Sequence, residues 1–227
     1  MMRATTTNHR TGITDALDEF AVTRARTREI VSGLTQEQLD FSLASNRWSI
    51  GEVLDHMLRA ERLNRDHVAR LIQLKREKQR PELRLTFSDL NVSVAGLPHS
   101  LLSLLEGPLT LMNMFVSDSL RNYLTRTRLI PFRNPDPATP LDSRPAAELR
   151  ADLIASFQAT KRLFENNPDL DYEEMFVQHP LLGRYDVPGL LRFMSAHEQR
   201  HQSQVTDTLE ILEKSVNGYE EDSEESA

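Results

Sequence analysis

The sequence predicts an all-α fold, a single domain in which four long helices form a bundle. Only 8 of the 227 residues are glycine and 39% are hydrophobic, so the chain can bury one substantial core and is poor in the turns that a β-sandwich needs. Apolar residues recur at spacings of three and four, the period of a helix with one buried face. Helix-capping residues stand where several of these segments begin.

The first long helix is expected from Ile13 to Ser32, with Gly33 as its end. Before it, residues 1–12 are expected to form a flexible N-terminus. After it, Thr35 and Gln38 fit a capping box, in which the two residues satisfy each other's backbone N–H groups, and a short helical turn should follow.

The second long helix has the strongest start signal. Ser49 and Glu52 form a capping box, while Trp48 and Val53 fit the hydrophobic staple that often surrounds such a cap. We expect this helix to run to about Lys78, because a proline follows shortly after and cannot continue it.

A long insertion is predicted between the second and third bundle helices, over residues 81–144. It should contain a further helix from Leu101 to about Thr127, followed by a proline-rich loop. The third long helix is expected from about Pro145 to Glu165, because proline is favoured at the first helical position.

The fourth long helix is expected from Val187 to about Ser215, with Asp186 as its N-cap and Asn217-Gly218 closing it. The bundle domain should therefore cover residues 13–215. Residues 216–227 contain five acidic residues and no basic one, which predicts a disordered tail.

Composition excludes several classes of protein. There is no cysteine, so disulfides, thiolate ligands and a cysteine nucleophile are excluded for this chain. The net charge of -7 argues against a nucleic-acid partner, which usually needs a basic face. No apolar run approaches the roughly 20 residues that span a membrane, and the N-terminus lacks the apolar centre of a signal peptide. We therefore expect a soluble, cytoplasmic protein.

Histidines on two apolar helix faces are the best indication of chemistry. His197 and His201 differ by about 40° around the helix axis and about 6 Å along it, so both rings can bind one ion. His56 lies on the apolar face of the second helix. On spacing alone, buried core histidines with hydrogen-bond partners remain the alternative to a metal site.

A competing motif overlaps this pair. His197, Glu198 and His201 satisfy H-E-x-x-H, in which a zinc protease uses the glutamate as its general base. The extended motif fails, because Gln204 and Asp207 stand where a glycine and a third histidine would come. This disfavours a protease.

Two segments carry a resemblance to a known family. RWSIGEVLDH, and later HPLLGRYDVPGLLRFMSAHEQRHQSQV, resemble the DinB-like family of metal-binding four-helix bundles. The similarity covers residues 13–78 and 145–214, whereas the insertion is longer than the family's usual connection.

The resemblance implies that His56, His197 and His201 are the three ligands of one divalent ion. Imidazole ligands suit zinc or nickel, with iron and copper as further candidates. Relatives include transferases that use a low-molecular-weight thiol as co-substrate, and metal-dependent hydrolases. The implied function is thus a metal-dependent enzyme acting on a small-molecule substrate by thiol transfer or hydrolysis.

A non-catalytic bundle is the alternative, with a structural metal or an apolar cleft for a ligand or partner. The family also implies a homodimer. In either case each metal-bound ring should donate the N–H of its other ring nitrogen to an acceptor. Four carboxylates are candidates: Glu52, Asp55, Glu61 and Glu198.

Three further side chains have positions that bear on the site. Glu198 is turned about 100° from His197, which favours a contact with a neighbouring helix. His67 lies about 16 Å from His56 along the helix, too far to share the ion. His179 precedes a proline before the fourth helix, where it either borders a pocket or is simply exposed.

Overall fold

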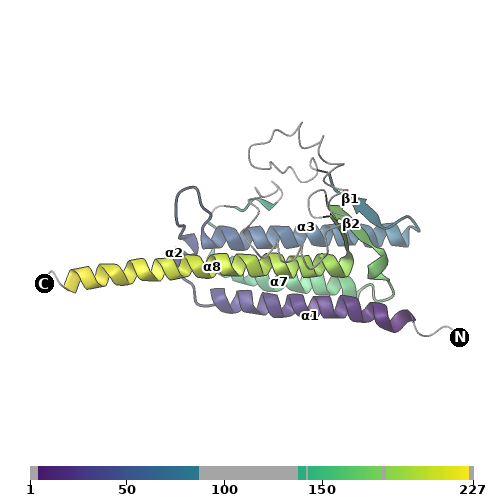
Figure 1. Ribbon diagram of the computed structural model, residues 1–227, viewed down its shortest axis with the longest axis horizontal. Coiled ribbons are helices and arrows are strands. Elements are labelled where there is room, and N and C mark those ends of the chain that lie inside the picture. The colour runs from purple at the N-terminus through teal and green to yellow at the C-terminus, as the bar shows by residue number, and fades with distance from the viewer. Residues whose placement is uncertain (1–4, 87–137, 142, 180–182, 225–227) are drawn as a thin grey trace.

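Four long helices packed as a bundle make up most of the protein (Figure 1). The computed structural model describes residues 5–86, 138–141, 143–179 and 183–224. The bundle consists of α1 (Thr5–Val31), α3 (Ile50–Arg76), α7 (Ala146–Glu165) and α8 (Val187–Glu224). Helices α1 and α3 each pack against both α7 and α8. The predicted mostly helical bundle is confirmed.

A small sheet at one end of the bundle was not predicted. Its three strands are β1 (Glu82–Arg84), β2 (Phe176–His179) and β3 (Gly183–Asp186), with β2 in the middle. Strand β1 runs parallel to β2, and β3 runs antiparallel to it. Strands of three or four residues place only one or two side chains on each face, too few for the alternation that reveals a strand.

Two short helical turns complete the described elements: α2 (Gln36–Asp40) and η2 (Tyr172–Glu174). Helix α2 follows the predicted capping box, since Thr35 accepts a hydrogen bond from the Gln38 backbone and the Gln38 side chain accepts one from Thr35.

The helix starts that cap chemistry predicts are confirmed. Ser49 Oγ accepts the Glu52 backbone N–H at 3.2 Å, and the Glu52 carboxylate accepts the Ser49 N–H at 2.6 Å. Asp186 Oδ1 accepts the Gly189 N–H at 2.7 Å at the start of α8. These bonds use backbone donors that the first turn of a helix leaves without helical partners.

Removing the α3 cap is expected to lower the free energy of unfolding by about 1 kcal/mol. The change is Ser49→Ala, at a side chain only 8% exposed, so water replaces the lost acceptor poorly. Urea unfolding measures it, with Ser45→Ala in the exposed part of the same loop as the control. Equal midpoints for both variants would contradict a role for this cap.

Two helix boundaries differ from the expected ones. Helix α1 begins at Thr5, so residues 5–12 are helical where a flexible terminus was expected. Helix α8 continues through Asn217-Gly218 to Glu224 instead of ending near Ser215. A glycine costs a helix only about 1 kcal/mol, so one glycine does not stop a long helix. The helix predicted over 101–127 lies outside the described residues.

The core consists of two apolar clusters with polar side chains between them. The cluster near the sheet contains residues from all four helices: Phe20, Leu71, Phe164 and Leu191 among others. The second cluster also draws on all four helices, with Val31, Leu54, Leu153 and Val205 among its members.

A buried polar layer separates these clusters. We define it by Arg24, Glu61, Thr160 and Glu198, one from each bundle helix, all at most 3% exposed. In each helix the layer residue falls between the buried members of the two apolar clusters. The bundle interior is therefore polar at mid-length.

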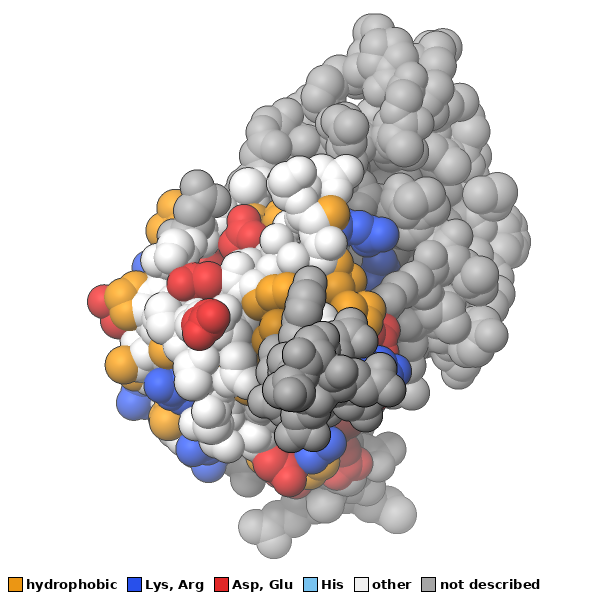
Figure 2. All heavy atoms as spheres, turned by 90° about the vertical axis from the view of Figure 1, so that its left-hand side faces the viewer, with side chains coloured by type: hydrophobic (Ala, Val, Ile, Leu, Met, Phe, Trp, Pro, Cys, Tyr) orange, Lys and Arg blue, Asp and Glu red, His pale blue; other side chains and the backbone are white. Residues whose placement is uncertain are grey.

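Helix α8 projects beyond the other helices toward the C-terminus (Figure 1). Figure 2 views the molecule from that side, where acidic, basic and apolar side chains are interspersed over the described surface. None of the helices in the described part of the chain combines the length and apolarity that crossing a membrane requires.

Candidate metal centre

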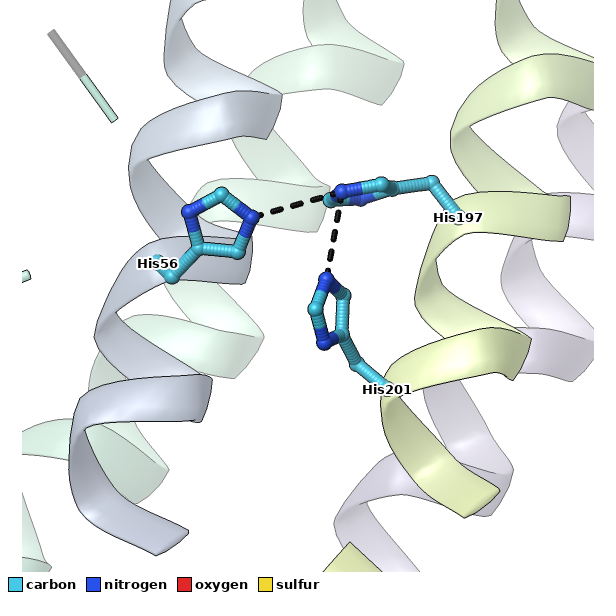
Figure 3. Close-up of side chains that lie close together, drawn as sticks. All are labelled: His56, His197 and His201. Atoms are coloured by element: carbon cyan, nitrogen blue, oxygen red, sulfur yellow. Dashed lines mark hydrogen bonds between the residues drawn. The ribbon is translucent and has the colours of Figure 1, made fainter. Parts of the chain in front are cut away.

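The three predicted histidines lie together inside the bundle, with His56 of α3 facing His197 and His201 of α8 (Figure 3). His197 Nε2 lies 3.3 Å from His56 Nε2 and 3.2 Å from His201 Nε2. Nitrogens that share a tetrahedral ion at about 2.0–2.1 Å lie about 3.3–3.4 Å apart, so these two distances match those of ligands on one ion. All three ligand nitrogens lie within 4.8 Å of one another.

Hydrogen bonds to the opposite ring nitrogens fix which nitrogen carries the proton. His56 Nδ1 lies 2.7 Å from the Ala138 carbonyl oxygen, and His201 Nδ1 lies 3.0 Å from the Gln204 amide oxygen. Both oxygens can only accept, so each Nδ1 donates. In a neutral ring, the Nε2 of His56 and of His201 then presents a lone pair.

This arrangement favours a bound cation. His197 Nε2 carries at most one proton when the ring is neutral, and it can donate that proton to only one of its two neighbours. With protons alone, at least one of the two short nitrogen–nitrogen contacts therefore has no proton to form a hydrogen bond. A divalent ion accepts all three lone pairs at once, which is the chemistry this donor set fits.

Burial favours the neutral form of the His56 and His197 rings. His56 is 2% exposed and His201 is 5% exposed, while His197 is partly exposed. Burial lowers the pKa of His56 below its ordinary value, and the charge of Arg200 adds to this effect against the opposing Ala138 carbonyl and Asp55. Burial lowers the pKa of His197 further, with His201, His56 and Arg200 contributing. Neutral rings are the form that binds metal.

These pKa shifts predict that the metal-free protein loses stability on acidification. The folded pKa of His56 and His197 lies below the ordinary 6.5, so their stabilising contribution is present above pH 6.5 and is lost as the pH falls. Each histidine should contribute a slope of up to about 1.4 kcal/mol per pH unit.

Urea midpoints of the metal-free protein from about pH 7.5 to about pH 5 measure this slope. The double variant His56→Gln/His197→Gln is the control and should show a flatter dependence. A wild-type midpoint that stays constant over this range would contradict the burial of neutral rings.

Aromatic side chains border the centre. The Trp48 ring lies 4.9 Å from the His56 ring, centroid to centroid, and Phe193 stacks on His197 at 6.1 Å. Trp48 also packs against the apolar cluster that includes Val53, as the predicted staple requires. Its contact with His56 was not predicted from the sequence.

The four carboxylates proposed as partners of the rings are engaged elsewhere, which corrects that prediction. Glu52 accepts the Ser49 N–H, Asp55 binds Arg59 and Arg144, and Glu61 and Glu198 bind Arg24. The Ala138 carbonyl and Gln204 take the expected role. Gln204 stands three residues after His201, a spacing that places two side chains on one helix face, so it was detectable. Nothing in the sequence marked Ala138.

Glu198 belongs to the buried polar layer. Its two oxygens accept Arg24 Nε at 2.9 Å and Arg24 Nη2 at 2.8 Å, and Thr27 also donates to it. The preference for a neighbouring helix is confirmed, because Arg24 and Thr27 lie on α1. A carboxylate held by these donors at 3% exposure is not available as the general base that the H-E-x-x-H interpretation needs.

Two further histidines whose side chains the structure describes lie away from the centre. His67 on α3 and His179 on β2 are both partly buried, and neither belongs to the group that could hold the ion. Burial lowers the pKa of His179 to about 3, with the charge of His67 contributing. His179 is therefore neutral at physiological pH and partly buried, where full exposure was one of two expectations.

The comparisons with known proteins identify one family. A family model described as the DinB superfamily matches residues 19–205, a range that contains all three histidines of the centre. No curated protein and no solved structure matches the chain.

Proposed function

The chain belongs to the DinB superfamily, and from that premise we propose that it is a metal-dependent enzyme acting on a small molecule. His56, His197 and His201 would hold one divalent ion, with zinc or nickel as the first candidates. The reaction we propose is thiol transfer from a low-molecular-weight thiol, or else hydrolysis.

One observation carries this proposal: three Nε2 atoms converge, and hydrogen bonds fix at least two of them as lone-pair donors. Three neutral ligands leave the ion its full +2 charge and an open coordination position, which is typical of catalytic sites. The ion would lower the pKa of a thiol or water bound there.

The residues around the centre support catalysis more than a structural role for the ion. The two apolar clusters join all four helices without the histidines, and the polar layer joins them again through Arg24. A fold already held in these ways does not need an ion to form. Trp48 and Phe193 supply apolar walls beside the rings, which strengthen electrostatic interactions by excluding water.

The first test is metal content together with the fold of the metal-free protein. Protein prepared without a metal-binding tag should contain about one ion per chain, and after chelation it should keep its helical circular dichroism and cooperative unfolding. Unfolding on chelation would indicate a structural ion. Failure to bind any ion after reconstitution would contradict the proposal.

The second test separates the two reactions. The metal-loaded protein is assayed with small cysteine-derived thiols and an electrophile that carries a chromogenic leaving group, and separately with esters and amides in the absence of thiol. Thiol-dependent turnover lost on chelation supports transfer. Turnover that needs only water supports hydrolysis, and the absence of both with a loaded centre would contradict either reaction for the substrates tried.

A further inference from the structure

The segment that contains the Ala138 carbonyl is also bound to α3 by Asp55, the residue next to His56. Asp55 is 2% exposed, and its carboxylate accepts the Leu141 backbone N–H at 2.8 Å and Arg144 Nη1 at 2.8 Å. Residues 138–141 are thereby held at Leu141 while Ala138 contacts His56. The two contacts with α3 lie three residues apart in the segment.

A carboxylate suits this position because it has several acceptor sites and no donor. The Asp55 oxygen that accepts Leu141 also accepts Arg59 Nε at 2.6 Å, so the side chain receives three donors from three places in the chain. Because two of these donors belong to arginines, the hydrogen bonds are of the strong, charge-assisted kind.

We propose that Asp55 is a positioning residue for His56, acting through residues 138–141 to hold the Ala138 carbonyl on Nδ1 and so aim the Nε2 lone pair at the metal centre. Its effect on metal affinity rests on the function proposed above. Its effect on the His56 ring does not, because the hydrogen bonds involve only protein atoms. The segment therefore contacts α3 twice, at two adjacent residues: Leu141 binds Asp55, and Ala138 binds His56.

A pair of arginine variants separates positioning from stabilisation. Arg144 and Arg59 both bind the Asp55 carboxylate, but only Arg144 follows closely in sequence on residues 138–141, which carry the Ala138 carbonyl. Arg59 lies four residues after Asp55 on α3 itself. If Asp55 only stabilises the fold, Arg59→Gln and Arg144→Gln should have equal effects on the His56 tautomer and on metal affinity. If it positions His56, only Arg144→Gln and Asp55→Asn should affect the ring.

Arg144 also binds Asp152 of α7 at 2.7 Å, so the arginine pair needs a further control. Asp152→Asn removes this second contact and leaves the contact between Arg144 and Asp55. If Asp55 positions the His56 ring, Asp152→Asn should leave the ring unchanged, as Arg59→Gln does. If the ring position depends instead on the contact with α7, Asp152→Asn should disturb the ring as Arg144→Gln does.

The first readout is the tautomer of His56 in the metal-free protein, from the nitrogen-15 chemical shifts of its ring. Wild type, Arg59→Gln and Asp152→Asn should show one tautomer with the proton on Nδ1. Asp55→Asn and Arg144→Gln should show a mixture of tautomers. This readout needs no ion, so it holds even if the metal proposal fails.

The second readout is the affinity for cobalt or zinc, measured by competition with a chelator. Asp55→Asn and Arg144→Gln should weaken binding by roughly tenfold to a hundredfold, the usual loss when a hydrogen-bond partner of a ligand is removed. The other two variants should stay within about twofold of wild type. Circular dichroism confirms that each variant is folded.

Two results would overturn the positioning role: an unchanged His56 tautomer in folded Asp55→Asn and Arg144→Gln, or equal losses of affinity in the Arg144 and Arg59 variants. A wild type that binds no ion would overturn the proposed function instead, and the tautomer alone would then decide the role of Asp55.

Discussion

Arg24→Ala is expected to lower the free energy of unfolding by about 3–5 kcal/mol, as removal of one member of a buried ion cluster does. Arg24 donates to Glu198, to Glu61 and to the Leu153 carbonyl, all inside the bundle. Without the guanidinium, the Glu198 carboxylate loses its counter-charge, and Glu61 keeps only a longer contact with Arg65 at 3.8 Å; both carboxylates are 3% exposed. They must then take up protons or admit water, and either costs stability.

Urea or thermal unfolding measures this effect, with Arg26→Ala as the matched control on the same helix. Arg26 pairs with Glu29, but both side chains are more than half exposed, so its loss should cost at most about 1 kcal/mol. A loss at Arg24 as small as that at Arg26 would show that the buried carboxylates are stabilised by other groups. Thr27 and Thr160, which donate to Glu198 and Glu61, are then the side chains to replace.

His201→Ala should weaken metal binding by more than roughly a hundredfold, beyond the loss that follows from removing a partner of a ligand. The other two rings would still face one another, but an ion held by two nitrogens loses a third of its protein ligands. The helical circular dichroism should persist, because the apolar clusters do not depend on His201.

His67→Ala is the control, since it removes a histidine of the same bundle that lies outside the centre. It should leave both stoichiometry and affinity unchanged. Full metal loading of His201→Ala would show that the ion, if present, is bound elsewhere.

Much of the bundle could be predicted because its signals are local. The caps at Ser49 and Asp186 follow from short spacings, and the apolar period placed the long helices. The convergence of His56 with α8 did not follow from residue spacing. It came from the family resemblance, because no local pattern relates residues 141 positions apart.

The contacts that could not be predicted join distant segments through the backbone or across the bundle. Any residue can present a carbonyl, so the sequence at Ala138 carries no mark of its role. Arg24 stands in an ordinary helical pattern, and its burial depends on three other helices meeting it. The short strands could not be predicted for another reason, because three or four residues are too few to show an alternating pattern of apolar and polar side chains.

The buried polar layer also bears on how the chain avoids misfolding. Apolar helix faces are tolerant of sliding, because one leucine replaces another at little cost. A slip of one helical turn, about 5.4 Å, would move Arg24 away from Glu61 and Glu198 and into an apolar cluster. Because an unpaired buried charge is costly, such a slipped bundle is strongly disfavoured. The helix register that pairs Arg24 with both carboxylates also places His197 and His201 at the same height along the bundle as His56. The buried ion pairs therefore favour the one register in which the three rings meet.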